Sequence, residues 1–417
     1  MKELSITLTH AGKQHAYKTA RNLMQLGVLD KFITSGYVSP SLLQDFFTKT
    51  GDHFWTRRFE PGLSGSLVES NWRFEIPETV HKLLHGHTQK LEQLVYDRDV
   101  AFDKYASKKI AARPSDFHYG FQGSSLLTMQ VAKEVGKQAI CELATAHVTE
   151  VDKILREEAR LHPEWAPTIT NLKFPVAYEK RLREEPFVAD HVVVASDFSR
   201  QSLLNAGLDQ SKISTIPLGF ELDHVSYTEK SFDNWNERPL KVLFAGTVTQ
   251  RKGFKYLLDA IKRFSKTDVE LHVIGNAYKE LDVFKKEVHN FHYHGSMAQN
   301  ELFVKYQEYD LLILPTVFEG FAMVIVEAMA AGLPVITTPH SIGPDVIEES
   351  NNSGIIVPIR DVDALVSAIH HFKNLDQDQM RKASTSARSA SQRFTWDTHR
   401  DSLNQFLREK LSEGGLV

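Results

Sequence analysis

Several features that would narrow the function are scarce in this sequence. It contains one cysteine, Cys141, so no disulfide forms within the chain, which is typical of a reducing compartment. No apolar run approaches the ~20 residues that span a bilayer. The first residues alternate like a strand and lack the apolar block of a signal peptide. We therefore expect a cytoplasmic protein, and a position at the inner face of the membrane stays open.

An excess of one charge is also missing. The 49 basic and 53 acidic residues give a net charge of −4, so no overall positive field favours nucleic acid. There is no Cys/His zinc spacing, no Gly-rich loop ending in Gly-Lys-Ser/Thr, and no Gly-x-Ser-x-Gly elbow. Three acidic pairs have metal-binding spacing, but Asp361 and Asp376 open predicted helices and Asp97 lies on one. We interpret them as caps or surface residues and expect no metal.

What the sequence does contain is a repeated alternation of short apolar strands and helices. A chain of 417 residues is too long to fold around one compact core, so two domains are expected. Such alternation predicts parallel sheets covered on both faces, which is an α/β fold. Strands are predicted over 5–9, 31–34, 138–144, 191–195, 241–245, 269–274, 310–314 and 334–337. Helices are predicted over 16–26, 151–161, 179–189, 254–264, 321–331 and 396–411. Periodicity is weak over 36–120.

The strongest local motif follows the strand that ends at Pro315. Its loop opens a helix near Gly320, where free backbone N–H groups can hold a pyrophosphate. A carboxylate beside a phosphate would be repelled by its negative charge. We therefore expect Glu319 to accept hydrogen bonds from sugar hydroxyls instead. Glu327 lies up to about 12 Å further along the helix and suits the ribose. The alternative is that neither residue binds a ligand. Glu319 would then be an acidic residue at the start of a helix, and Glu327 would lie at the polar edge of a core helix. The donor-binding candidates of this turn are Gly320, Phe321, Ala322, Met323 and Val324.

A second loop, Gly246 to Gly253, brings two cations to the end of a strand. Arg251 can bind phosphate oxygens bidentately, and Lys252 can act as a point charge. The alternative is a solvated pair, although the helix dipole disfavours cations there.

In the first half, Gly12 and Lys13 follow the first strand and could also hold a phosphate. His147 follows a strand as well, and it could reach the cleft or cap a helix.

Taken together, these motifs resemble glycosyltransferase family 4, retaining enzymes with the GT-B fold of two Rossmann-like domains. The resemblance rests on Glu319 and Glu327 with seven residues between them, on the Gly-Leu-Pro-Val run at 332–335, and on Gly246 with Arg251 and Lys252. It is best over 241–369 and thin over 36–120.

The resemblance implies a role for each motif. Arg251 and Lys252 would bind the donor diphosphate, Glu319 and His147 the sugar, and Glu327 the ribose. Gly12 and Lys13 would keep a phosphate contact, and Gly275 and His294 would lie near the base. It also implies an acceptor-side domain at 1–220, a nucleotide-sugar domain at 221–394, and a helix at 395–417 that returns to the first domain.

The expected function is transfer of a sugar from a UDP- or GDP-type donor, without a metal or other cofactor. The acceptor would be a glycan, a lipid-linked molecule or a small molecule, as in polysaccharide biosynthesis. An epimerase, a phosphorylase and a non-catalytic sugar-nucleotide-binding protein stay open as alternatives. Residues 36–120 could bind a lipid-linked acceptor or a membrane surface, or form an ordinary packed subdomain. The residues behind that expectation are Phe46, Phe47, Phe54, Trp55, Arg57, Arg58, Lys104, Lys108, Lys109 and Arg113.

Overall fold

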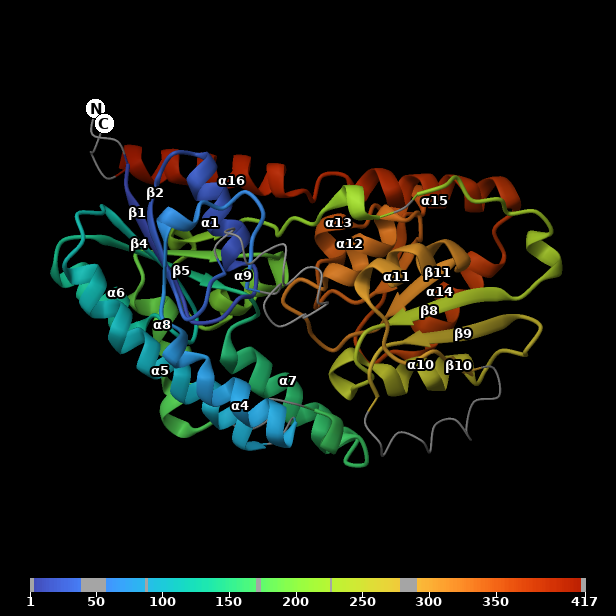
Figure 1. Cartoon of the computed structure of the whole chain (residues 1–417). Coiled ribbons are helices and arrows are strands. Elements are labelled where there is room, and N and C mark those ends of the chain that lie inside the picture. The colour runs from blue at the N-terminus through green and yellow to red at the C-terminus, as the bar shows by residue number, and fades with distance from the viewer. Residues whose placement is uncertain are drawn as a thin grey trace.

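The computed structural model describes residues 4–38, 58–86, 89–169, 174–225, 227–277 and 291–413. These residues form two parallel β-sheets, one from each half of the chain, which lie side by side with helices packed around them (Figure 1). The predicted α/β class with two Rossmann-like sheets is therefore confirmed.

The first sheet has the strand order β3-β2-β1-β4-β5-β6-β7 in the described residues. Every residue of the two central strands β1 and β4 is buried, because helices cover both faces. The strands are β1 (Ile6–His10), β2 (Leu29–Thr34), β3 (Val68–Ser70), β4 (Phe117–Phe121), β5 (Gln138–Leu143), β6 (His191–Val194) and β7 (Ile213–Thr215). The helices of this half are α1 (Ala16–Gln25), α4 (Ile76–His85), α5 (Gln89–Ala111), α6 (Leu126–Glu134), α7 (Val148–Leu161), α8 (Val176–Val188) and α9 (Asp197–Asn205).

The second sheet has the order β10-β9-β8-β11-β12-β13, again with parallel pairs. Its strands are β8 (Leu240–Ala245), β9 (Val269–Ile274), β10 (Phe291–Tyr293), β11 (Leu311–Leu314), β12 (Val335–Thr337) and β13 (Gly354–Ile356). Its helices are α10 (Phe254–Ile261), α11 (Gln299–Lys305), α12 (Met323–Ala330), α13 (Gly343–Val346), α14 (Val362–Lys373) and α15 (Gln377–Ser391). The carboxyl ends of β8, β9 and β11 therefore lie at one edge, where parallel sheets bind ligands.

Most predicted elements are found within one to three residues of their expected bounds. The helix expected from Phe321 begins at Met323, because Ala322 adopts a left-handed conformation with φ of 64°. The expected caps are also found, since Asp361 accepts from the N–H of Ala364 and Asp376 from that of Gln379, both at 2.8 Å.

The stretch over 36–120 is more regular than its sequence indicates. It supplies β3, α4, α5 and β4, and β4 lies at the centre of the first sheet. Of the aromatic and basic residues singled out there, Phe46, Phe47, Phe54, Trp55 and Arg57 lie outside the described residues.

Two segments of the chain cross between the halves, and they lie against each other. Phe220 and Thr395 pair as an isolated parallel bridge, and the N–H of Phe220 donates to the carbonyl of Phe394 at 3.0 Å. A Cβ on Gly219 would lie 2.4 Å from the nitrogen of Trp396, so only glycine allows this approach.

The last helix, α16 (Trp396–Glu413), packs on the first half after the chain has completed the second (Figure 1). Asn22 of α1 donates to the carbonyl of Trp396 at 3.0 Å. Leu403, Phe406 and Leu407 are buried in the same cluster as the residues of β1 and β4. The helix therefore fastens the end of the chain to the first sheet.

Replacing Leu403 with alanine should destabilise the first half by about 2–5 kcal/mol, because a buried leucine leaves a cavity. Urea denaturation measures the change in the free energy of unfolding, and hydrogen exchange of the β1 amides assigns it to the first half. Gln405→Ala, at an exposed position of the same helix, should change stability by less than about 0.5 kcal/mol. Equal effects of the two substitutions would mean that α16 does not contribute to this core.

Candidate functional site

Two loops at the carboxyl edge of the second sheet are joined by hydrogen bonds. One follows β8 and contains Arg251, and the other follows β11 and contains Val317. The N–H of Val317 donates to the carbonyl of Arg251 at 2.9 Å, and the hydroxyl of Thr316 donates to it at 3.0 Å. The structure therefore brings the two predicted donor loops together.

Three charged side chains meet where these loops touch. Arg251 Nη1 and Lys252 Nζ each lie 2.7 Å from the same oxygen, Oε1 of Glu319. Burial alone would raise the pKa of Glu319, but the charges of Lys252 and Arg251 outweigh burial and lower it. Glu319 is therefore ionised at neutral pH. Two cations around one carboxylate leave a surplus positive charge in a sheltered place, which suits an anionic ligand.

Gly246 makes room for this cluster. It ends β8 with its N–H donating to the carbonyl of Ile274 at 2.8 Å. A Cβ here would lie 3.1 Å from Cε of Lys252, so a side chain would press on the lysine. Gly275, at the end of the neighbouring strand, donates to the carbonyl of Gly295 at 2.8 Å.

Gly320 lies at the contact between the two halves. A Cβ on Gly320 would lie 2.1 Å from the carbonyl oxygen of Ala144, at the end of β5. Ser196 of the first half donates its hydroxyl to the carbonyl of Gly320 at 2.6 Å. The glycine therefore lets the backbones of the halves approach closely beside the charge cluster.

A pocket of about 300 Å³ opens between the halves at this point. The second half supplies charge to it through Arg251 and Glu319, and the first half supplies mainly apolar surface. The lining residues are Gln122, Ala144, Thr145, Ala146, Val148, Val151, Phe174, Leu182, Arg251, Phe318, Glu319 and Gly320. A ligand here would contact both halves.

His147 lies next to this pocket, but its ring is turned away. It precedes α7 in the chain, and its neighbours Ala146 and Val148 line the pocket while His147 does not. The ring nitrogens contact the hydroxyl of Thr149 and, at 3.5 Å, the carbonyl of Arg183. Burial lowers the pKa of His147, so the ring is neutral at neutral pH. Contact with a donor sugar stays a prediction that needs the ring to rotate.

The loop of Gly12 and Lys13 lies between β1 and α1, at the carboxyl edge of the first sheet. A Cβ on Gly12 would lie 3.0 Å from Nε2 of His10. Burial, helped by the charge of Arg98, lowers the pKa of His10 well below its usual value. Both ring nitrogens of His10 are buried without a hydrogen-bond partner among the described residues, a feature the sequence did not reveal.

The first turn of α12 and Glu327 follow Glu319 of the charge cluster in the chain. Phe321 and Ala322 are buried, and Met323 and Val324 begin the helix, whose first N–H groups have no partner within it. Glu327 accepts from Gln299 at 2.8 Å and from Tyr306 at 3.4 Å. Burial raises the pKa of Glu327, and these hydrogen bonds offset the increase only in part. The carboxylate therefore has protein partners, with acceptor capacity left for a hydroxyl.

His294 lies just past β10 and interacts with a second histidine. Its Nε2 is 3.1 Å from Nδ1 of His272, and the two rings are stacked with centroids 5.4 Å apart. A contact with the donor base stays a prediction for His294 and for Gly275.

Glu158, which sequence reasoning missed, is a fully buried carboxylate on α7 that joins the two halves. It accepts from Gln250 at 2.6 Å, from Tyr256 at 2.7 Å and from Arg360 Nε at 2.7 Å, all in the second half. Gln250 directly precedes Arg251, so Glu158 positions the loop that carries both cations. These partners lie far apart in the chain, and no local pattern marks them.

Comparisons with known proteins agree with this architecture. Residues 239–374 match the model of the family described as glycosyl transferases group 1. The chain is 24% identical over 238 residues to the putative colanic acid biosynthesis glycosyltransferase WcaL of Salmonella typhimurium, covering 52% of this chain and 55% of that protein. It is 27% identical over 256 residues to O-antigen chain mannosyltransferase B of Escherichia coli, covering 56% and 64%. The chain thus spans little more than half the length of the first of these relatives.

Among solved structures, that of Anabaena Alr3699/HepE in complex with UDP and glucose is similar over 98% of this chain and all of that one. The TM-score is 0.60 at 16% sequence identity. This likeness concerns the fold, which is GT-B, as expected. Within the described residues, none of the helices has the length and apolar character that crossing a membrane would require.

The buried carboxylate of Glu158 generates a prediction about the join between the halves. Glu158→Ala should cost about 3–5 kcal/mol, because Arg360 and two polar groups lose their buried acceptor. Thermal and urea unfolding would measure the loss.

The neighbouring residue provides a matched control. Glu157 binds Nη1 of the same Arg360 at 2.8 Å, but its side chain is 45% exposed. Glu157→Ala should therefore cost less than about 1 kcal/mol. If Glu157→Ala destabilised the protein as much as Glu158→Ala, the role of burial would be refuted.

Proposed function

We propose, from the match of residues 239–374 to the family described as glycosyl transferases group 1 and from the resemblance to family 4, that this chain transfers a sugar from a nucleotide diphosphate sugar to an acceptor hydroxyl with retention of anomeric configuration. The observation that carries the proposal is the cluster of Arg251, Lys252 and Glu319 at the contact between the halves. The neighbour of known structure was solved with UDP and glucose, and a relative is named a mannosyltransferase. Both fit a UDP- or GDP-type donor.

In this mechanism the two cations serve the departing diphosphate. Negative charge develops on the phosphate oxygen as its bond to the sugar C1 breaks, and Arg251 and Lys252 stabilise that charge in a sheltered site. When phosphate oxygens take up these cations, Glu319 is released to accept hydrogen bonds from sugar hydroxyls. Glu327, which keeps acceptor capacity, binds the ribose.

Retention is what the resemblance to family 4 implies. None of the residues that we assign to the donor is an obvious nucleophile, so we propose a single step on one face of the sugar. The acceptor oxygen attacks C1 from the face that the diphosphate leaves. The C1–O(phosphate) bond breaks, the C1–O(acceptor) bond forms, and a phosphate oxygen takes the acceptor proton. No divalent metal or other cofactor takes part in this proposal, because Arg251, Lys252 and the first N–H groups of α12 supply the charge.

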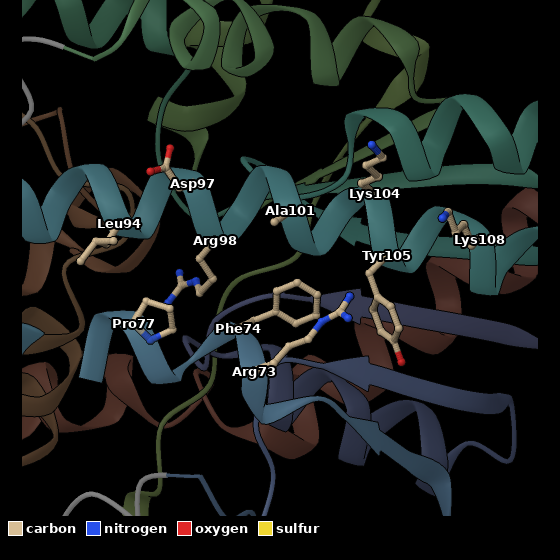
Figure 2. A pocket seen from close by; sticks show the side chains of 10 residues that line it. All are labelled: Arg73, Phe74, Pro77, Leu94, Asp97, Arg98, Ala101, Lys104, Tyr105 and Lys108. Atoms are coloured by element: carbon tan, nitrogen blue, oxygen red, sulfur yellow. The ribbon is translucent and has the colours of Figure 1, made fainter. Parts of the chain in front are cut away.

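The acceptor belongs on the first half, where a groove of about 610 Å³ lies between α5 and the segment leading into α4 (Figure 2). Arg73 stacks over the rings of Phe74 and Tyr105, with its guanidinium carbon 4.6 and 5.3 Å from their centroids. Lys104 and Lys108 add positive charge to the lining. Phe74 also packs in one cluster with Ala11, which directly precedes Gly12 of the predicted phosphate loop.

Helix α4 next to the groove exposes an apolar face. Ile76, Val80, Leu83 and Leu84 are 57%, 47%, 79% and 71% exposed, and their spacing places them on one side of the helix. Apolar side chains beside lysines and arginines are typical of a surface that lies on an anionic membrane. We infer that this face meets the membrane and that the groove takes a lipid-linked acceptor.

The phosphate role of the cations can be measured with a bare nucleotide diphosphate. Arg251→Ala and Lys252→Ala should each weaken binding by about 1.5–3 kcal/mol, the scale of a charged hydrogen bond. Calorimetry with UDP and with GDP gives the values. Lys255→Ala is the control, because Lys255 lies on the next turn and binds Asp259 instead. Unchanged affinity in both loop variants would remove this loop from the donor site.

Substitutions of Glu319 and Glu327 should differ in their effects on turnover and on nucleotide binding. Glu319→Gln should depress turnover more than it weakens binding of bare nucleotide, because its partner is the sugar. Glu327→Gln should weaken bare nucleotide as well, because its partner is the ribose. Calorimetry and steady-state kinetics on both variants test this. Parallel behaviour with nucleotide and with sugar donor would refute the division of roles.

The membrane face predicts binding to vesicles of anionic lipid that falls as salt rises. The double variant Leu83→Asp and Leu84→Asp should lose sedimentation with the vesicles. Val176→Asp should keep it, because Val176 is an exposed apolar residue, 86% accessible, on a different helix. Sedimentation that is absent in the unsubstituted protein, or equal in both variants, would end the membrane proposal.

A further inference from the structure

Four side chains of metal-binding type gather at the edge of the second sheet, and none of them belongs to the charge cluster of Arg251, Lys252 and Glu319. Glu270 and His272 lie on β9, and His292 lies on β10, the edge strand in the described residues, with His294 just beyond it. His292 pairs with His272 in the parallel register. Side chains two residues apart share one face of a strand, so all four stand on the same face of the sheet.

The ligand atoms are close enough for one ion. Atoms from Glu270, His272 and His292 all lie within 4.8 Å of one another. Ligand atoms around a tetrahedral zinc ion lie about 3.3 Å apart, given Zn–N distances near 2.0–2.1 Å. The rings of His272 and His292 are stacked 16° from parallel with centroids 4.7 Å apart. Coordination therefore requires these side chains to rotate until ligand atoms that lie within 4.8 Å of one another reach that spacing.

One ring nitrogen of His272 lacks a hydrogen-bond partner among the described residues. This nitrogen, Nε2, is buried. The nearest carboxylate oxygen, Oε2 of Glu270, is 3.6 Å away, which is too long for a hydrogen bond. A buried polar atom without a partner is costly, and a metal ion would satisfy it.

The other nitrogen of His272 is oriented as metal-binding histidines require. Its Nδ1 lies 3.1 Å from Nε2 of His294. With the proton on Nδ1, His272 donates to His294 and leaves the Nε2 lone pair free. Such a second hydrogen bond fixes the tautomer and direction of a metal-binding ring.

From these contacts we propose a binding site for a divalent transition metal ion of the zinc class. Glu270, His272 and His292 are the ligands, water completes the coordination, and His294 is a positioning residue. Two imidazoles favour zinc over magnesium or calcium, which prefer oxygen ligands. The ion links β9 to the edge strand β10 and stabilises that edge. It takes no part in the transfer reaction.

The site lies on the path to the donor loops. The chain leaves β10 through Gly295, whose carbonyl accepts from Gly275 at 2.8 Å, and a Cβ on Gly275 would lie 2.0 Å from the carbonyl oxygen of Gly246. An ion that holds β10 in register thus also holds the backbone next to the phosphate loop. The inference does not depend on the proposed function, because its readout is binding of the metal alone.

The experiment is a titration of the full-length chain, freed of metal by EDTA and gel filtration, with Zn²⁺ against a chromophoric chelator. One high-affinity equivalent should bind and raise the melting temperature, and Co²⁺ should give the absorption of a tetrahedral site. His272→Ala and His292→Ala should lose this binding. His294→Ala should weaken it by about 10–100-fold, the usual effect of a residue that orients a ligand.

A second histidine pair supplies the control. His81 and His85 on α4 lie with ring centroids 4.9 Å apart and could bind Zn²⁺ independently. The double variant His81→Ala and His85→Ala should keep the high-affinity equivalent. His292 is exposed, so its alanine variant should fold normally, which circular dichroism would verify. Binding that survives in folded His292→Ala, or that disappears in the α4 variant, would overturn the proposal.

Discussion

The site depends on one shared oxygen. Oε1 of Glu319 lies 2.7 Å from both Arg251 and Lys252, in a place where burial alone would raise the pKa of the carboxyl group. The cations make the buried anion tolerable, and the anion holds two flexible cations in fixed positions before a ligand arrives. A diphosphate that enters can take over the cations without further ordering of the loop, which is how pre-organised charge gives affinity and catalysis.

The same cluster requires the two halves of the chain to stay in contact. Gly320 touches the end of β5 across the join, and Glu158 holds Gln250, the residue before Arg251. The crossing at Phe220 and Thr395, and the packing of α16 on the first sheet, keep these contacts aligned. The fold and the proposed chemistry therefore share one set of interactions.

Much of the second half could be predicted because its strands are continuous apolar runs. β9 was predicted with its observed bounds, and β8, β11 and β12 within one residue. The first half was harder. β4 lies at the centre of its sheet but contains His118 and Gly120, which obscure the apolar pattern. Of the long helix α5, only the helical run around Asp97 was predicted.

At the site, the loops could be predicted but their partners could not. Local spacing identified Arg251, Lys252 and Glu319, whereas their ion pairs join positions 67 residues apart for Lys252. Glu158 reaches Gln250 over 92 residues and Arg360 over 202, so only the folded chain reveals its role. His147 was assigned from resemblance, and its ring is turned toward Arg183 and Phe187. Side-chain direction of this kind depends on packing between helices, which spacing does not encode.

Retaining transfer driven by protein charges can be tested in a single reaction. The full-length chain is incubated with a nucleotide diphosphate sugar and an acceptor in excess EDTA, and the anomeric configuration of the product is read by NMR. If transfer is retaining and driven by protein charges, the product is a glycoside with the anomeric configuration of the donor. An inverted product, transfer that requires added Mg²⁺ or Mn²⁺, or release of nucleotide without any acceptor would contradict it.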